Sequence, residues 1–482
     1  MSFDLSSPPV HVREDSSCFS AGHLPRSLAF SPDGLLLLAS TEQRSARVLS
    51  LPPDTFVDAA AEGDGAAGGG AAPPARPLRA PLARVCAVSE PTSLRAAAWF
   101  PLMSAADPAR ALFLTAAREQ PLHLWDCLSG APRGSYVAVD AADEVVGAHA
   151  AAFSADGALV LGGFERALCA WDAARPGRAL HRWPTAPTRH ASTGQRGVIC
   201  ALAPDPRGGG TGVAAGSFDG SLRGYDARTG AVTALYEDNG GGIVVAESGE
   251  EGAAEGVAAE GVGGGGSRRG VGGGGGGTSG GGGGTSGGGG GASGGNDGGA
   301  KGDSRSGRPP SRAAVTHAAF TADGSLLCAG RRRCGDVLVW DTRAPAAPLY
   351  RLQRDASSAQ RLQFALDGAS CTLATGSRDG ALIFYDLHRG RHVRTLRGMP
   401  DAVAAVAMHP AGVAFAVATG QRARRGGTGG GSDSDSEPRA GEAPAPTLSM
   451  WRAVASPKEP GALKTPLFKT RRKRLRRRGC RC

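Results

Sequence analysis

The sequence has few aromatic residues, no long apolar run and few helix signals. Phe, Trp and Tyr make up 5% of the 482 residues. No apolar run approaches the roughly 20 residues that span a bilayer, and the N-terminus MSFDLSSPPV lacks the pattern of a signal peptide. Sustained 3.6-residue periodicity is absent outside Ala-rich stretches. These absences predict a soluble intracellular protein that is poor in helix.

Signatures of metal sites and catalysis are also missing. The ten cysteines form no CxxC pair, so zinc is not expected, and their use suits a reducing compartment. There is no HExxH motif, His/Asp/Ser set or paired-carboxylate spacing, and the GxGxxG-like matches follow no strand-to-helix turn. The conspicuous aspartates Asp33, Asp156, Asp219 and Asp379 lie in expected turns, where a structural role is the simpler explanation. We therefore expect no enzyme, metal or cofactor.

What the sequence does contain is a repeated unit. Residues 143–178 hold one copy: an apolar run ending at Phe153, the turn SADG, a second run, and a third run closing on Trp171-Asp172. Short apolar runs separated by Asp-Gly turns predict antiparallel strands. One such unit cannot bury both faces of its sheet, but several units in a ring can.

Seven copies of the unit can be laid out in order. The first passes SPDG at 31–34 and lacks the closing pair; the others close at Trp125-Asp126, Trp171-Asp172, Tyr225-Asp226, Trp340-Asp341, Tyr385-Asp386 and Trp451. Intervals of 46, 54 and 45 residues separate neighbouring closing positions, close to the roughly 40–45 residues of a WD40 blade. The sequence therefore predicts an all-β, seven-bladed WD40 β-propeller, although the usual His–Ser–Asp–Trp set is incomplete.

The predicted organisation has a disordered N-terminus over 1–15, the propeller over 16–457 and a basic disordered tail over 458–482. Residues 16–21 are expected to supply the fourth strand of the last blade and so close the ring. Insertions at 52–81, 239–312 and 421–446 are rich in Gly, Ala, Pro or charge, and are expected to be mobile loops.

The net charge of +10 lies entirely in the tail, because residues 1–457 hold 43 basic and 43 acidic residues. The tail's run RRKRLRRR is typical of nuclear import or of sequence-independent phosphate binding, and a solvated disordered tail is the plain alternative. The import candidates are Arg471, Arg472, Lys473, Arg474, Arg476, Arg477 and Arg478. Cys480 and Cys482 also resemble a prenylated terminus, which stays open, but no membrane partner is expected.

Arginines also gather in the fifth to seventh copies. Guanidinium groups suit phosphate contacts and stacking on unpaired bases. A composition rich in Ala, Gly and Arg explains why Arg replaces Lys, but not why three arginines, 331–333, follow one another in a single turn.

Several stretches resemble a known family. WFPLMSAADP at 99–108, REQPLHLWDCLSG at 118–130 and GRRRCGDVLVWDTR at 330–343 resemble the telomerase Cajal body protein family, WD-repeat proteins that bind small Cajal body RNAs (scaRNAs). The resemblance covers most of 18–451 in collinear order. The 74-residue Gly-rich loop and the basic tail depart from the family, whose long N-terminal extension is not present here.

The resemblance implies a seven-bladed propeller that recognises a hairpin-loop element of box H/ACA RNAs, including telomerase RNA. It further implies H/ACA RNP proteins as partners, folding by the cytosolic chaperonin, and a nuclear, Cajal body location with some protein in the cytoplasm. The positions that match functional surface are Arg331, Arg332, Arg333, Arg343, Arg361, Gln421 and Arg422.

We therefore expect a non-enzymatic RNA-binding scaffold that directs scaRNAs to nuclear bodies and assists assembly of their RNPs. Whether telomerase RNA is a client stays open. The alternative is a WD40 protein-interaction adaptor of the chromatin or ubiquitin-ligase type, in which the arginines grip an acidic peptide without direct RNA binding.

Overall fold

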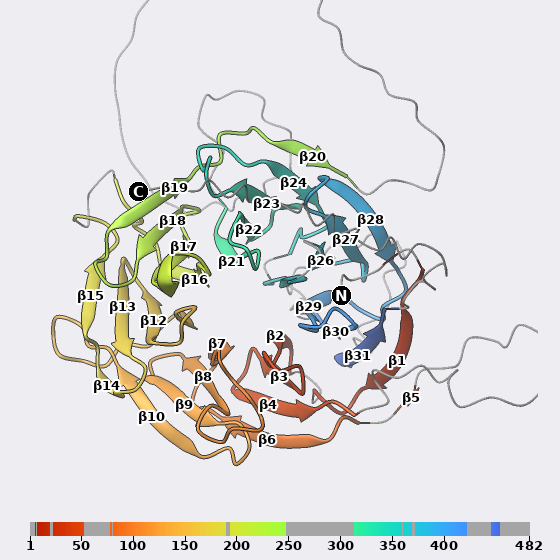
Figure 1. The fold of residues 1–482 in the computed structure, drawn as a ribbon, viewed down its shortest axis with the longest axis horizontal. Helices are drawn as coiled ribbons and strands as arrows, with labels where there is room; N and C mark the ends of the chain where they lie inside the picture. Colours follow the sequence, from red (N-terminus) through yellow and green to blue (C-terminus); the bar gives the residue numbers. More distant parts are fainter. Residues whose placement is uncertain are drawn as a thin grey trace, which may run out of the picture. The chain divides into compact units, whose positions relative to one another are not determined.

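The structure, a computed structural model, describes residues 5, 7–19, 23–52, 78–79, 81–188, 193–246, 313–358, 360–368, 372–421 and 445–453. Within these ranges the regular elements are β-strands, apart from one 3-10 turn at Gly208–Gly210. The strands form seven sheets placed around a central axis (Figure 1). The predicted seven-bladed propeller is confirmed. No helix in the described residues is long and apolar enough to cross a membrane.

Each blade holds four antiparallel strands, and the first strand lies nearest the axis. Blade 1 contains β2 (Pro25–Phe30), β3 (Leu36–Thr41), β4 (Ser45–Ser50) and β6 (Arg84–Ser89). Blade 2 contains β7 (Leu94–Trp99), β8 (Leu112–Ala117), β9 (Leu122–Asp126) and β10 (Pro132–Val137). Blade 3 contains β11 (Ala150–Phe153), β12 (Leu159–Phe164), β13 (Ala167–Asp172) and β15 (His181–Pro184). Blade 4 contains β16 (Ile199–Pro204), β17 (Gly212–Ser217), β18 (Leu222–Asp226) and β19 (Val232–Tyr236).

The remaining three blades follow the same plan. Blade 5 contains β21 (Val315–Phe320), β22 (Leu326–Arg331), β23 (Asp336–Asp341) and β24 (Tyr350–Gln353). Blade 6 contains β25 (Phe364–Leu366), β26 (Thr372–Gly376), β27 (Leu382–Asp386) and β28 (Arg391–Leu396). Blade 7 contains β29 (Val403–Met408), β30 (Ala414–Thr419), β31 (Thr447–Arg452) and β1 (Val10–Asp15). Three short strands add parallel edges to blades 7, 2 and 5: β5 (Leu78–Arg79), β14 (Gly177–Arg178) and β20 (Ile243–Val245).

The Asp-Gly turns are stabilised by a hydrogen bond to the aspartate side chain and by a glycine with positive φ. In blade 1, Ser31 Oγ donates to Asp33 Oδ1 at 2.6 Å, and the next residue, Gly34, has φ +77°, a left-handed conformation that glycine adopts without strain. The same arrangement recurs in blade 5, where the hydrogen bond from Thr321 first, and then those from Ser325, lower the pKa of Asp323 to about 2. The structural interpretation of these aspartates is therefore correct for the turns that follow the first strands.

The closing aromatic residues pack between blades. Trp171 on β13 is fully buried and its Nε1 donates to the carbonyl of Val137 in blade 2 at 3.1 Å. Trp340 makes the corresponding bond to Glu237 of blade 4 at 3.0 Å. In blade 2, Trp125 Nε1 donates to Thr115 Oγ1 at 2.7 Å. The third strands of blades 3 and 5 thus fasten these blades to the preceding ones, whereas the Trp125 bond lies within blade 2.

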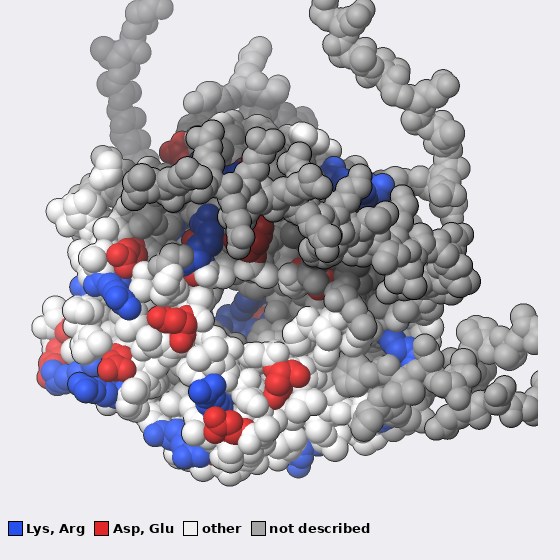
Figure 2. Space-filling model, in the orientation of Figure 1, with Lys and Arg blue, Asp and Glu red and all other residues white. Residues whose placement is uncertain are grey.

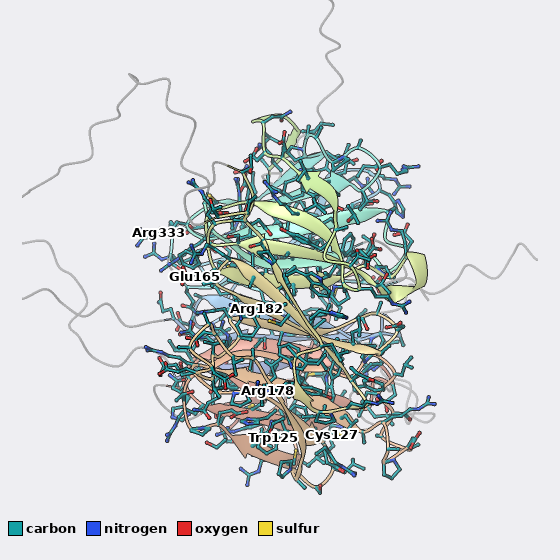
Figure 3. The ribbon with its side chains drawn as sticks, turned by 90° about the vertical axis from the view of Figure 1, so that its left-hand side faces the viewer. Trp125, Cys127, Glu165, Arg178, Arg182 and Arg333 are labelled. Carbon is teal, nitrogen blue, oxygen red and sulfur yellow. The ribbon has the colours of Figure 1, made fainter. Side chains whose placement is uncertain are left out.

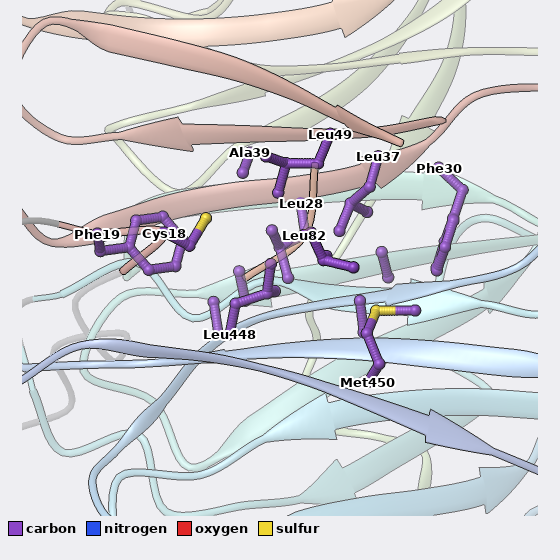
Figure 4. Close-up of a cluster of buried hydrophobic side chains, with 14 residues drawn as sticks. Cys18, Phe19, Leu28, Phe30, Leu37, Ala39, Leu49, Leu82, Leu448 and Met450 are labelled. Carbon is purple, nitrogen blue, oxygen red and sulfur yellow. The ribbon is translucent and has the colours of Figure 1, made fainter. Parts of the chain in front are cut away.

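The ring closes with a strand from each end of the chain. Strand β1 pairs antiparallel with β31, from Val10 opposite Arg452 to Asp15 opposite Leu448. Behind this pairing, side chains of blades 1 and 7 form one buried apolar cluster, which includes Leu28, Leu448 and Met450 (Figure 4).

The predicted closing strand at 16–21 was wrong, since the strand ends at Asp15, inside the segment expected to be disordered. Asp15 Oδ1 accepts the backbone N–H groups of Ser17 and Cys18 at 2.8 and 3.0 Å, which turns the chain. Cys18 and Phe19 do not form a strand but are buried in the apolar cluster between blades 1 and 7. Their apolar character therefore reflects core packing.

Most of the three predicted insertions lies outside the described residues. The part of 239–312 that is described includes β20, whose apolar run IVV pairs with the outer strand of blade 5. Arg422 and the tail 458–482, with all seven nuclear-import candidates, lie outside the described residues.

Candidate functional site

The ring has two faces with different turns. We call the mouth face the one that carries the turns between second and third strands; the opposite face carries the turns between first and second strands. In the side view, Arg333 and Glu165 lie toward one end of the blades and Cys127 toward the other (Figure 3). The axial view shows acidic and basic side chains interspersed on the ring, with basic side chains in the depth of the central opening (Figure 2).

On the mouth face the central opening widens into a cavity of about 360 Å³, here called the channel mouth. Four arginines from four blades line it: Arg26 of blade 1, Arg95 of blade 2, Arg332 of blade 5 and Arg361, which precedes the first strand of blade 6. Glu42 is the one acidic residue of the described lining. The channel mouth is therefore strongly basic although the body of the chain is neutral.

A repeated backbone irregularity explains how Arg26 and Arg95 reach the axis. The pairing of first and second strands shifts register around one residue in five blades; those residues are Arg26, Arg95, Cys200, Thr316 and Ala404. A β-bulge of this kind redirects a side chain away from the regular alternation. Four of these five residues line the channel mouth. His149 occupies the corresponding place just before β11 and lines it too.

The channel mouth holds positive charge that the described residues do not neutralise. The Nε atoms of Arg332 and Arg361 are buried and have no hydrogen-bond partner among these residues. Burial, and next the charge of Arg26, lower the pKa of Arg361 to about 9. A buried guanidinium is stable only when its charge and its donors are matched. The site therefore favours an anion that presents several acceptor oxygens.

An aromatic ring stands beside the arginines. Phe218 follows β17 and is 48% exposed, and the Arg332 guanidinium lies over its ring at 5.5 Å. Arg26 is held by a hydrogen bond from its Nε to the carbonyl of Arg95 at 2.6 Å. An exposed ring paired with a guanidinium plane is a platform on which a flat ligand group stacks.

A second cavity on the axis is lined by the first strands and by Gln363. It has a volume of about 260 Å³, and several of these first strands are rich in Ala. The Gln363 side chain accepts from the N–H of Leu28 and donates to its carbonyl, both at 2.9 Å, which joins blade 6 to blade 1. The described residues contain no group of three His, Cys, Asp or Glu placed to hold a metal ion.

The sequence-predicted site residues fall into separate places. Arg332 and Arg361 come together at the channel mouth. Arg333 is exposed in the same turn, with φ +57°. Gln421 is exposed after β30, where its N–H donates to Asp401 at 3.1 Å. Arg343 lies after β23, on the opposite face from the 331–333 turn, is 81% exposed and pairs with Asp341 at 3.0 Å.

Arg331 takes part in a network of ion pairs. Its side chain is 14% exposed and contacts Asp238 at 2.6 Å and Asp336 at 2.7 Å. Arg351 contacts the same two carboxylates. The four side chains form a charge-balanced network that fastens the chain after β19 to blade 5, although the buried Nε of Arg331 has no hydrogen-bond partner among the described residues.

Sequence reasoning missed Arg26 and Arg95, since each is a single arginine in a different blade. Alignment of the first strands on the turns that follow them puts both in one column with His149, Cys200 and Thr316. This shared position in the repeats is the sequence pattern that could have identified Arg26 and Arg95.

Comparison with known proteins supports the motif-based resemblance. No protein-family model matches the chain. The chain is 26% identical to telomerase Cajal body protein 1 of Bos taurus over 399 residues, 82% of this chain and 57% of the bovine protein. The Homo sapiens protein of that name is also 26% identical, with 56% of its length covered. The Drosophila melanogaster homolog is 25% identical over 84% of this chain and 58% of the fly protein. The resemblance is confirmed, and the chain spans less than two thirds of these relatives.

Proposed function

We propose, starting from the resemblance of this chain to the telomerase Cajal body proteins, that it is a non-enzymatic RNA-binding scaffold of the nucleus. It recognises a hairpin loop of box H/ACA scaRNAs, and of telomerase RNA where that RNA carries the same loop element. It directs these RNAs to Cajal bodies and works with H/ACA RNP proteins. The cytosolic chaperonin assists its folding.

The observation that carries this proposal is the convergence of four arginines from four blades at the channel mouth. Phosphate oxygens accept two parallel hydrogen bonds from the forked N–H groups of a guanidinium, as carboxylate oxygens do. These charge-assisted hydrogen bonds are stronger than those between a guanidinium and water. The buried Nε atoms of Arg332 and Arg361 are then satisfied by the ligand. The bound RNA thus supplies the negative charge that the described lining of the site provides only through Glu42.

The shape of the site favours an unpaired loop over a duplex. A concave opening of about 360 Å³ admits single extruded nucleotides, whereas duplex RNA is contacted across a broad, shallow minor groove. Phe218 and Arg332 offer a stacking surface for an unpaired base. Stacking of this kind contributes about 1–3 kcal/mol per base.

The test begins with crosslinking and immunoprecipitation of the tagged protein, followed by sequencing of the bound RNA. We expect enrichment of box H/ACA RNAs that share one hairpin-loop element. Protein partners that persist after ribonuclease treatment, with no enriched RNA, would instead support the adaptor alternative.

Purified variants then locate the site. Arg332→Gln and Arg361→Gln are each expected to weaken binding of an enriched hairpin roughly tenfold or more and to reduce its salt dependence. Arg175→Gln is the matched control, since Arg175 is 86% exposed beside β13 and does not line the channel mouth. Arg343→Gln separates the two faces, and we expect little effect. Unchanged affinity in both channel-mouth variants would remove this site from the proposal.

A further inference from the structure

A second, larger hollow on the mouth face adjoins the channel mouth. It has a volume of about 810 Å³ and lies over blades 2 and 3; we call it the side cleft. Arg95 and His149 line both the side cleft and the channel mouth. A ligand strand held at the channel mouth can therefore continue outward into the side cleft without leaving the surface.

The side cleft differs from the channel mouth in its charges. Its lining includes the carboxylates of Glu119, Asp140 and Glu165 together with Arg118, Arg166 and Arg182. Acidic and basic groups are thus nearly balanced, whereas the channel mouth has one acid among four arginines. A lining with nearly equal numbers of acidic and basic groups attracts a phosphate backbone only weakly. The side cleft therefore suits a different part of a ligand than the channel mouth does.

The charged groups of the side cleft are available to a ligand. Arg118 and Glu119 pair at 3.0 Å with side chains that are 61% and 70% exposed, and Arg166 meets Glu165 at 3.6 Å with Glu165 66% exposed. Exposed pairs of this kind contribute about 0–1 kcal/mol. A ligand that offers better-matched donors and acceptors can therefore replace these contacts at little cost.

The backbone under these side chains is fixed. Glu165 and Arg166 form the turn between β12 and β13. The Arg166 N–H donates to the carbonyl of Gly197 at 3.3 Å, and the Arg166 carbonyl accepts from the N–H of Thr185 at 2.9 Å. Arg182 donates to the carbonyl of Val139 at 3.2 Å and lies over the Phe164 ring at 5.9 Å. The blade 3 part of the side cleft is therefore a pre-formed surface whose backbone is already fixed before a ligand binds.

Carboxylates and guanidinium groups on a fixed surface suit the edges of unpaired bases. A carboxylate accepts from the amino and imino groups of bases, and arginine donates to base oxygen and nitrogen acceptors. Carboxylates repel phosphates, so they place the backbone away from the cleft floor and turn the bases toward it. Phosphate contacts position a nucleic acid, whereas base-edge contacts determine sequence preference.

We infer that the side cleft is the element that reads sequence in the RNA loop whose phosphates the channel mouth holds, with Glu119 and Glu165 as specificity-determining residues. This inference rests on the proposed RNA-binding function. The two sites on the mouth face then have different roles. The arginines of the channel mouth supply affinity for any unpaired loop, and the acidic and basic side chains of the side cleft select among loop sequences.

The test uses the full chain and a library of RNA hairpins with one stem and a fully randomised loop. Bound and unbound hairpins are sequenced for the wild type, Glu119→Gln, Glu165→Gln and Arg332→Gln. Glutamine keeps the shape of glutamate and adds a donor, and both glutamates are exposed, so these variants are expected to fold. Glu237→Gln is the control, an exposed carboxylate after β19 that does not line the side cleft.

In the glutamate variants we expect discrimination to fall roughly tenfold at one or two loop positions, the size of one lost base contact. Arg332→Gln should instead lower affinity for all loops by a similar factor, and Glu237→Gln should reproduce the wild-type profile. Selective binding by the wild type with unchanged profiles in both glutamate variants would overturn the inference while leaving the proposed function in place. A wild type that binds no hairpin would overturn both.

Discussion

Replacement of Arg331 should destabilise the ring, because its side chain belongs to a largely buried ion-pair network between blades 4 and 5. In the variant Arg331→Met, Asp238 and Asp336 lose one of the two guanidinium groups that they share. The remaining trio of one Arg and two Asp then carries an uncompensated negative charge between blades 4 and 5.

The size of the effect follows from burial. Removal of one partner from a fully buried ion pair costs about 3–5 kcal/mol, and an exposed pair about 0–1 kcal/mol. The four side chains are 13–26% exposed, so we expect a loss of roughly 2–4 kcal/mol of unfolding free energy. The double variant Arg331→Met/Asp336→Asn restores charge balance and should recover roughly half of that loss.

Urea unfolding, followed by tryptophan fluorescence, measures this loss through the midpoint at constant slope. A shift equivalent to less than about 0.5 kcal/mol in Arg331→Met, with no recovery in the double variant, would refute the stabilising role of Arg331. A variant with the charges of Arg331, Arg332 and Arg333 all reversed would be a poor test of RNA binding. Loss of binding could then come either from unfolding of the ring or from loss of a contact with the RNA.

Two further predictions concern the channel mouth. Arg361→Met should raise the unfolding free energy of the RNA-free protein by about 1–3 kcal/mol, because it removes a buried donor without a matched partner, while it weakens RNA binding; destabilisation by this change would contradict our account. His149 should couple binding to pH. Burial first, then Arg95 and Arg118, lower its pKa, with Glu165 acting in the opposite direction. A nearby phosphate raises that pKa again, so affinity should increase about threefold as the pH falls from about 7.5 to 6. The same titration with His149→Asn should be flat, and an equal pH response in both proteins would exclude this histidine.

The fold could be predicted from sequence because its determinants are local and repeated. The Asp-Gly corners fix backbone angles within a few residues, and the closing aromatic residues recur at the spacing of one blade, as from Trp125 to Trp171 and from Trp340 to Tyr385. The closing strand could not be placed in the same way. VHVRED at 10–15 and SSCFSAGH at 16–23 both contain apolar residues, and the choice between them depends on the turn at Asp15 and on core space between blades 1 and 7.

The site was only partly predictable, for a related reason. Clustering in sequence drew attention to 331–333, yet three consecutive residues in a turn point in different directions. Arg331 turns toward two carboxylates, Arg332 lies over Phe218, and Arg333 is exposed. The residues that do converge come from different blades: bulges in the first strands redirect Arg26 and Arg95, whereas Arg332 follows β22 and Arg361 precedes β25. Convergence at an axis depends on equivalent positions in the repeats and not on proximity along the chain.

The pairing of β1 with β31 also determines the order of events during synthesis. As the chain leaves the ribosome, β1, which completes the last sheet, emerges before the other described strands, and its partner β31 emerges only after six other blades. Until then the growing arc carries open strand edges at both ends, which invite wrong pairing between molecules. A closed chamber that isolates the nearly finished chain would shorten that exposure. The folding assistance proposed above would therefore act on the same strand pair that closes the finished ring.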